Sequence, residues 1–347
     1  PTAHLGPEAG VPPRRKDALS MEYRELGETG LMASVIGLGT WVMGGWMWGG
    51  AEDLESLGTL RRAIDMGINL IDTAPIYGHG RSEELVGKAV AESGRRESVL
   101  LATKVGLEWN MEKTSVWRNS SQPRITREID DSLRRLRTDW IDIYQVHWPD
   151  TTVTFEETMD ALLDLQRLGK IRFIGLSNFT VDQIGRCRAV GPLHVLQPPY
   201  NLFERDIENR ELAYCRDHRI GTLVYGPLCR GLLSGKYRGD EAFTSGDVRQ
   251  LDPKFQGDRF QTYVGCVERL KELAVRHGKT VSQLAIRWCL EQPGVSVALC
   301  GARRPDQLDE NAGAAGWSLS ADDLEEIDRI VAETIAEPIG PQFMAPP

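Results

Sequence analysis

The feature that most constrains this fold is an alternation of short β-branched segments with amphipathic segments of helical period, repeated eight times along the chain. Such an alternation indicates βαβ units and a parallel sheet. Because the units follow one another without a linker, they favour a closed (β/α)8 TIM barrel over an open, doubly wound sheet. The expected strands are VIGLG (35–39), INLI (68–71), SVLLATK (98–104), WIDIYQVH (140–147), IRFIGL (171–176), LHVLQ (193–197), IGTLVY (220–225) and VSVALC (295–300).

The segments around these strands complete the expected domain. Helical patterns lie at 52–67, 82–94, 126–137, 155–170, 208–219 and 268–292. The stretch MEYRELGETGLMAS (21–34) carries the turn residues of an N-terminal β-hairpin that could close one end of the barrel. The Pro- and Gly-rich opening (1–20) has no periodicity and is expected to be a mobile tail. We therefore expect a single barrel domain over 21–347.

The composition and net charge of the chain argue against several kinds of binding partner and site. The chain has 41% hydrophobic and 26% charged residues, as ordinary globular proteins do. Its formal net charge of −9 argues against nucleic acid and anionic membranes as partners. The opening lacks the apolar core of a secretory signal, so a cytoplasmic location is expected. The six cysteines and six histidines show neither CxxC nor HExxH spacing, which argues against a metal site or a disulfide framework.

Polar and ionisable side chains recur at the expected carboxyl ends of the strands. In a (β/α)8 barrel these ends meet at one mouth, where active sites lie. The positions are Asp72 with Tyr77 five residues later, Lys104, His147, Ser177 with Asn178, Gln197, Tyr225 to Leu228, and Gly301 to Arg304. Each alone has an ordinary structural explanation, such as a helix cap for Ser177. Their repetition at one level of the barrel indicates a functional site.

These residues carry a close resemblance to a known family. The set Asp72, Tyr77, Lys104 and His147, with the motifs GLSNF, LQPPYNLFER and PLCRGLLSGKY, resembles the aldo-keto reductase family from Met21 onward. The segments ALCGARRPDQL and PIGPQFMAPP are similar to bacterial reductases of the general-stress and inositol-utilisation type. The resemblance implies a (β/α)8 barrel, a nicotinamide cofactor, usually NADPH, and interconversion of small-molecule carbonyls with alcohols.

The implied reaction gives each of the four residues a role. Reducing a carbonyl by hydride creates an alkoxide, which needs a proton and charge stabilisation. The resemblance implies Tyr77 as general acid/base. A free phenol has a pKa of about 10, and we expect the Lys104 ammonium beside it to lower that pKa. Asp72 would pair with Lys104 and keep it charged, while His147 would donate to the substrate oxygen.

The resemblance also implies which residues bind the cofactor. Ser177, Asn178 and Gln197 would hold the nicotinamide amide, because they offer both donors and acceptors, with Tyr225 stacked on the ring. The sequence YGPLCRG lacks the serine that relatives often have after the aromatic residue. The other positions of this set are Gly226, Pro227, Leu228 and Lys236 along the pyrophosphate, and Thr40, Trp41, Asp72 and Arg230.

The turn after the last strand is expected to bind the adenosine end of the cofactor. Gly301 allows a tight turn, and DQLDEN (306–311) begins a helix with free N–H groups. Arg303 and Arg304 offer charged forks suited to a 2′-phosphate. By resemblance, adenine and ribose are bound at Gln307, Glu310 and Asn311. Because Gln307 replaces an arginine that many relatives use, we expect Arg303 to be the main phosphate contact and NADPH to be preferred over NADH.

Two loop regions are expected to enclose this site. WVMGGWMWGG (41–50) follows the first strand, and its aromatic residues would wall the substrate pocket. Trp109, Trp117 and Trp148 lie in the equivalent loops. The polar segment from Tyr237 to Arg259 is long for a structureless loop and is expected to be a lid over the cofactor.

Two other functions fit the sequence. A non-catalytic or weakly catalytic NADPH-binding regulatory subunit would keep the same residues. A barrel isomerase or aldolase could use Lys104 as a Schiff-base nucleophile. That second alternative leaves Tyr77 and His147 without roles. The sequence leaves the physiological substrate and the oligomeric state open.

Overall fold

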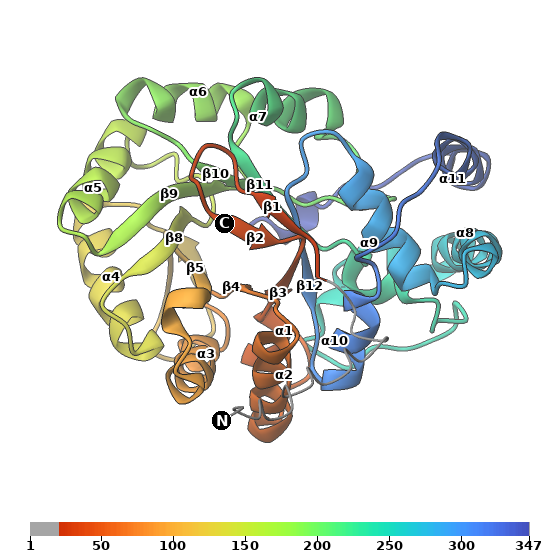
Figure 1. Cartoon of the computed structure of the whole chain (residues 1–347), viewed down its shortest axis with the longest axis horizontal. Helices are drawn as coiled ribbons and strands as arrows, with labels where there is room; N and C mark the ends of the chain where they lie inside the picture. The colour runs from red at the N-terminus through yellow and green to blue at the C-terminus, as the bar shows by residue number, and fades with distance from the viewer. Residues whose placement is uncertain (1–20, 347) are drawn as a thin grey trace, which may run out of the picture.

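The eight expected strands form a closed parallel barrel. The computed structural model describes residues 21–346, so the expected N-terminal tail lies outside the described residues. The strands pair in the closed order β10-β11-β12-β3-β4-β5-β8-β9, and every pair is parallel (Figure 1). Their bounds are β3 (Ile36–Gly39), β4 (Leu70–Asp72), β5 (Leu100–Val105), β8 (Ile141–Val146), β9 (Ile171–Ser177), β10 (Val195–Gln197), β11 (Gly221–Tyr225) and β12 (Val297–Gly301). The (β/α)8 prediction is confirmed.

Amphipathic helices surround the barrel (Figure 1) and bury their apolar faces against its outer surface. Capping boxes define the starts of α6 and α9, where Thr180 and Thr280 each accept from a backbone N–H three residues on. The α-helices are α1 (Trp41–Gly44), α2 (Asp53–Asp65), α3 (Arg81–Ser93), α4 (Gln122–Leu136), α5 (Phe155–Arg167), α6 (Val181–Val190), α7 (Ala213–Asp217), α8 (Gly257–Arg276), α9 (Val281–Glu291), α10 (Pro305–Ala312) and α11 (Ala321–Thr334).

The expected N-terminal hairpin closes the bottom of the barrel. Strands β1 (Tyr23–Glu25) and β2 (Met32–Ser34) pair antiparallel, and in Figure 1 they cross the centre of the barrel. Leu26, Leu31 and Ala33 pack in one cluster with residues at the amino ends of the barrel strands, such as Leu70 and Leu100. The opposite mouth is therefore the open end.

Three local features differ from the sequence-based expectations. Residues 268–292 form parts of two helices, because α8 ends at Arg276 and α9 begins at Val281. The segment 208–219 opens with a π-helical turn (Glu208–Leu212) before α7. An additional hairpin, β6 (Leu107–Trp109) with β7 (Val116–Arg118), follows β5 at the open mouth.

Short 3-10 helices occupy several connections. The segment 237–259 contains η4 (Val248–Gln250) and η5 (Pro253–Phe255), and α8 begins inside it, so it is a folded loop. The others are η1 (Arg96–Ser98), η3 (Cys229–Ser234) and η6 (Gln342–Met344). Over residues 21–346 no helix is long and apolar enough to cross a bilayer.

Candidate active site

The open mouth of the barrel holds one large cavity of about 1050 Å³. Asp72, Ser177, Gln197, Tyr225 and Gly301 are each the last residue of a barrel strand, as the sequence indicated. The parallel order brings them to the same rim. All the expected cofactor residues line the cavity: Thr40, Trp41, Asp72, Ser177, Asn178, Gln197, Tyr225, Gly226, Pro227, Leu228, Arg230, Lys236, Gly301, Arg303, Arg304, Gln307, Glu310 and Asn311.

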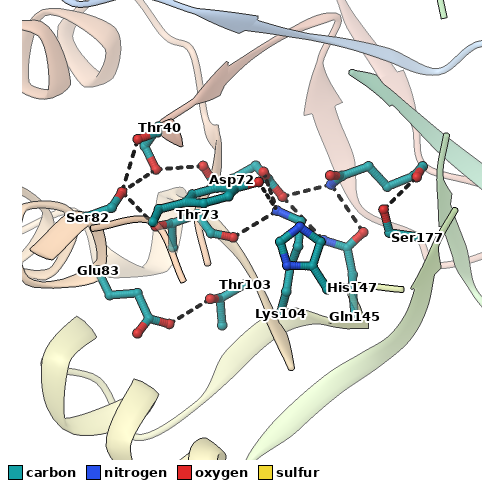
Figure 2. A network of polar contacts seen from close by, with 12 residues as sticks. Thr40, Asp72, Thr73, Ser82, Glu83, Thr103, Lys104, Gln145, His147 and Ser177 are labelled. Atoms are coloured by element: carbon teal, nitrogen blue, oxygen red, sulfur yellow. Dashed lines mark hydrogen bonds and ion pairs between the residues drawn. The ribbon is translucent and has the colours of Figure 1, made fainter. Parts of the chain in front are cut away.

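The four expected catalytic residues meet at the floor of this cavity. Lys104 Nζ donates to Asp72 Oδ2 at 2.6 Å, to the Thr73 carbonyl at 2.9 Å and to the Tyr77 hydroxyl at 3.3 Å (Figure 2). The Tyr77 ring stands edge-on to the His147 ring, with their centroids 5.8 Å apart. Tyr77 and His147 line the cavity, whereas the Lys104 side chain is fully buried behind them. Lys104 is therefore connected to the cavity through Asp72 and Tyr77, which both line it.

The Tyr77 turn is held in place by backbone contacts. The residues after β4 form a tight turn in which the Tyr77 amide donates to the Ala74 carbonyl and the Ser82 amide to the Tyr77 carbonyl. Gly78 has a φ of +67°, which favours glycine. An added Cβ at Gly44 of α1 would lie 2.5 Å from the Tyr77 carbonyl carbon. The phenol is thus positioned by the close approach of α1 to this turn.

Burial dominates the ionisation of these groups. Burial raises the pKa of the Tyr77 phenol well above its usual range, and the Asp72 carboxylate raises it further. The expected lowering of this pKa is therefore not seen, because loss of hydration and the Asp72 carboxylate both raise it. Burial also lowers the pKa of Lys104, against the opposing effect of Asp72.

The histidine at the site is held neutral. Burial and, secondarily, the Lys104 ammonium lower the pKa of His147 well below its usual range. At neutral pH the site thus contains a protonated phenol and a neutral imidazole. Both can donate a hydrogen bond into the cavity.

The polar residues expected at the nicotinamide form one connected set. Ser177 Oγ donates to the Gln197 carbonyl at 2.8 Å, and Asn178 Nδ2 donates to the His147 carbonyl at 2.9 Å. The Tyr225 hydroxyl donates to Asn178 Oδ1 at 2.8 Å. Asn178 adopts a φ of 66°, a left-handed conformation that asparagine tolerates better than most residues. These contacts fix the rim where a carboxamide would be recognised.

The other end of the cavity is cationic. Lys236, Arg249, Arg303 and Arg304 line it, and burial followed by the three arginines lowers the pKa of Lys236. Over residues 21–346 no carboxylate forms an ion pair with Lys236. Arg303 donates to the Trp48 carbonyl, whereas the more exposed Arg304 pairs with Asp306 at 3.0 Å.

Two expected cofactor residues already have partners within the protein. The Arg230 guanidinium is buried and bonded to Glu204 and Asp252, so it is a wall of the cavity and not a free cation. Gln307 Oε1 accepts from the Arg303 amide at 2.9 Å and from the Arg304 amide at 3.4 Å, which caps the start of α10.

Tryptophans wall the other side of the cavity. Trp41 stacks on Tyr77 at 6.1 Å, and Trp41, Trp46, Trp109 and Trp148 pack around the buried cluster that contains Tyr77. Trp117, in contrast, is 39% exposed on β7 of the β6–β7 hairpin. The cavity lining includes Trp41, Trp46 and Trp48 of the loop after β3 and also Trp148, whereas Trp109 and Trp117 do not line the cavity.

The cavity fits a dinucleotide. Amide donors and acceptors lie at one end and a group of cations at the other. The indole N–H groups of Trp41 and Trp48 are buried at the cavity without a hydrogen-bond partner among the described residues. Such unpaired donors are costly unless a ligand satisfies them.

Comparison with known proteins agrees with this geometry. The sequence model described as "Aldo/keto reductase family" matches residues 35–332. The chain belongs to the aldo/keto reductase family. It is therefore an oxidoreductase of carbonyl groups that uses a nicotinamide cofactor.

Individual relatives support the same assignment. The chain is 52% identical over 328 residues to "Aldo-keto reductase YhdN" of Bacillus subtilis (strain 168), covering 94% of this chain and 98% of the relative. It is 36% identical to the "NADH-specific methylglyoxal reductase" of Escherichia coli (strain K12), covering 86% and 95%. The solved structure of the glycerol dehydrogenase AKR11B4 from Gluconobacter oxydans matches with a TM-score of 0.85 at 44% identity, covering 93% of this chain and 99% of that chain.

Among the residues that sequence reasoning missed at the site are Gln145, Arg249 and Phe343. Gln145 of β8 donates to Asp72 beneath the cavity, and its position in a buried apolar strand was a signal that could have revealed it. Arg249 lies in the segment expected to be a lid, where nothing in the sequence distinguishes it. Phe343 of η6 lines the cavity from the C-terminal segment.

Proposed function

We propose that this protein reduces aldehydes and ketones reversibly to alcohols with NADPH, with Tyr77 as the general acid/base. The observation that carries the proposal is the position of the Tyr77 hydroxyl at the cavity floor, 3.3 Å from Lys104 Nζ, which is itself paired with Asp72. The bound nicotinamide supplies the hydride. The protein must then orient the carbonyl, exclude water and deliver a proton.

Tyr77 is suited to deliver that proton. Its raised pKa keeps the phenol protonated at neutral pH, so a proton is present when negative charge develops on the substrate oxygen. The Lys104 ammonium beside the hydroxyl stabilises the phenolate that results. Asp72 keeps that ammonium fixed and charged despite its burial. The neutral His147 donates a second hydrogen bond that orients the carbonyl.

The burial of Lys104 argues against Schiff-base chemistry. A nucleophilic lysine must reach the carbonyl carbon of its substrate. The Lys104 amine is fully buried, donates to three oxygen atoms and does not line the cavity. These contacts support a role as a fixed charge behind Tyr77.

The lining supports uncharged substrates. Apart from the cationic end, much of the lining is apolar, with Trp46, Ile76, Leu107, Val116 and Trp148, and the uncharged Thr114 and Ser115 lie among these residues. A carboxylate placed among these residues would lose its hydration without gaining a cationic partner. Benzaldehyde should therefore be reduced with a higher kcat/KM than 4-carboxybenzaldehyde. Equal values for the two aldehydes would contradict this substrate class.

The cationic end supports NADPH over NADH. The name of one relative specifies NADH, so the family alone does not decide the cofactor. Arg303 is half-buried beside Lys236 and Arg249. Within residues 21–346 these three cations have one neighbouring carboxylate, Asp247, which pairs with Arg249, so the group keeps a net positive charge. A phosphate carries about two negative charges near neutral pH and accepts charge-assisted hydrogen bonds.

Cofactor titration of two variants tests this assignment. Arg303→Ala should weaken NADPH by roughly tenfold to a hundredfold, since charge-assisted hydrogen bonds contribute about 1.5–3 kcal/mol each. NADH affinity should barely change. Lys236→Met is the matched comparison, because a pyrophosphate contact would weaken both cofactors equally. Equal losses of NADPH and NADH affinity in Arg303→Ala would show that this arginine does not bind the 2′-phosphate.

A further inference from the structure

Asp72 is held by two buried amide side chains in addition to Lys104. Its Oδ2 atom accepts from Lys104, while Oδ1 accepts from Gln197 Nε2 at 2.8 Å and from Gln145 Nε2 at 3.3 Å (Figure 2). Gln197 Nε2 also donates to Gln145 Oε1 at 3.2 Å. Both glutamines are buried, with 0% exposure for Gln145 and 2% for Gln197. The three residues form a closed triangle of hydrogen bonds inside the barrel.

A glycine makes this arrangement possible. Gln145 of β8 lies in register with Gly175 of β9, and its partner Gln197 is on the next strand, β10. A Cβ added at Gly175 would lie 2.6 Å from Gln145 Cγ, closer than real contacts allow. The Gln145 side chain therefore packs over Gly175 of β9 toward Gln197 of β10, because residue 175 has no side chain.

We propose that Gln145 is a positioning residue of the active site, acting through Asp72 and Gln197. The inference rests on the proposed roles of Asp72 and Lys104. By occupying Oδ1, the two amides leave Oδ2 as the acceptor for the Lys104 ammonium. By accepting from Gln197 Nε2, Gln145 uses both amide protons of Gln197. The Gln197 Oε1 atom is then left as an acceptor at the cavity, suited to the N–H of a carboxamide.

A space-filling role for Gln145 makes a different prediction. If the side chain only filled the barrel interior, a residue of equal length would replace it without consequence for turnover. Gln145→Met keeps the length and removes both the donor and the acceptor. If Gln145 has the positioning role, Asp72 loses one hydrogen bond in Gln145→Met. The side-chain amide of Gln197 is then free to rotate, so that its oxygen and nitrogen exchange places.

Steady-state kinetics of Gln145→Met is the first test. We expect kcat for an aldehyde to fall by about tenfold, the effect of one hydrogen bond to a charged group, with KM for the aldehyde within about twofold. NADPH affinity should weaken by several-fold, and the melting temperature should change little. Wild-type kcat and NADPH affinity would overturn the proposal. A fall in melting temperature with unchanged kcat would overturn it too.

The glycine provides a second test that does not depend on one variant folding well. Gly175→Ala should displace Gln145 and lower kcat by about the same factor as Gln145→Met. In a Gln145→Ala background the clash with Cγ is absent, so adding Gly175→Ala should change kcat by less than about twofold, since the two sites share one contact. The same loss in both backgrounds would overturn the coupling.

Failure of this inference is distinguishable from failure of the proposed function. If Gln145→Met matches wild type while Tyr77→Phe is inactive, only the positioning role is wrong. If wild type turns over no aldehyde with NADPH, the proposed function is wrong. The positioning role would then be overturned with it, because it is defined by turnover.

Discussion

At the scale of single residues, the site depends on a buried charge pair. Lys104 and Asp72 are fully or nearly fully removed from water, and their contact is 2.6 Å long. Taking two charges out of water is costly, and each charge is tolerated because the other is present. The pair is thus not expected to be a net source of stability, which agrees with its proposed role beside Tyr77. The same burial raises the pKa of Tyr77 and keeps its proton in place.

Removing one partner should show this dependence. Lys104→Met leaves the Asp72 carboxylate buried without its cation, so the free energy of unfolding should fall by roughly 3–5 kcal/mol. Lys104→Met combined with Asp72→Asn should be less destabilised than the sum of the two single variants. Denaturant unfolding of the four proteins measures this coupling. Additive losses would mean that the two side chains do not act as a pair.

The buried neutral histidine gives a dependence of stability on pH. The pKa of His147 is lowered in the folded protein, with Lys104 as the nearby cation and the Tyr77 phenol uncharged beside it. Below a pH of about 6.5 the unfolded chain binds a proton that the folded chain does not, so stability falls as pH falls. This group contributes up to about 1.4 kcal/mol per pH unit in that window. Unfolding of His147→Gln between pH 7 and 5 should show a shallower slope than wild type, and equal slopes would contradict the assignment.

The residue scale also shows what the sequence could predict of the site. Asp72, Tyr77, Lys104 and His147 could be predicted to lie at one mouth because each is at, or shortly after, the carboxyl end of an apolar strand, and their catalytic roles came from the family resemblance. The direction of the Tyr77 pKa shift was not predictable, because it depends on how completely the tertiary structure removes water. The catalytic and cofactor roles of these residues stay predictions until variants are measured.

At the scale of elements, the position of Tyr77 depends on α1 and the turn that follows β4. Gly44 of α1 contacts the backbone of Tyr77 and Gly78 so closely that any Cβ would meet main-chain atoms. The backbone of neither element can give way as a side chain could. The placement of the phenol is therefore set by the approach of two elements and not by its own rotamer alone.

A glycine substitution should separate this positioning from stability. Gly44→Ala should push the Tyr77 turn away from Lys104 and lower kcat by at least about tenfold, as small misplacements of reacting groups do. Gly185→Ala in α6 is the matched control, because no atom lies within 4 Å of its added Cβ. That control should keep wild-type kcat and gain roughly 0.5–1 kcal/mol in helix stability. Wild-type kcat in Gly44→Ala would contradict the role of this contact.

Some strands and helices could be predicted from the sequence, and others could not. The barrel strands were found because parallel strands are buried on both faces and appear as continuous apolar runs. The β6–β7 hairpin was missed because its strands have three residues each, with polar and aromatic residues mixed. The interruption between α8 and α9 was missed although Gly278 and the Thr280 capping box mark it.

At the scale of the whole molecule, the hairpin and the segment 237–259 lie at opposite ends of one barrel. The β1–β2 hairpin seals the amino ends of the strands with Leu26 and Leu31. At the other mouth, the Val248 amide donates to the Met47 carbonyl at 2.9 Å, which joins the segment 237–259 to the loop after β3. Both residues line the cavity, and the role of the segment 237–259 as a lid over the cofactor stays a prediction.

The single-domain organisation over 21–347 stays a prediction. The barrel strands and helices share one large apolar cluster, which favours unfolding as a unit. Calorimetry should then give one transition whose van't Hoff and calorimetric enthalpies agree. Two resolved transitions would contradict a single domain.

The central claim is that Tyr77 supplies the proton in carbonyl reduction, and Tyr77→Phe tests it most directly. Phenylalanine keeps the ring that stacks on Trp41 and removes only the hydroxyl, so the fold and the cavity should persist. We expect kcat for an aldehyde to fall by roughly 10²–10⁴-fold, the usual contribution of a general acid. NADPH affinity measured on the same sample should stay within about twofold of wild type. A kcat close to wild type with NADPH still bound would contradict the account.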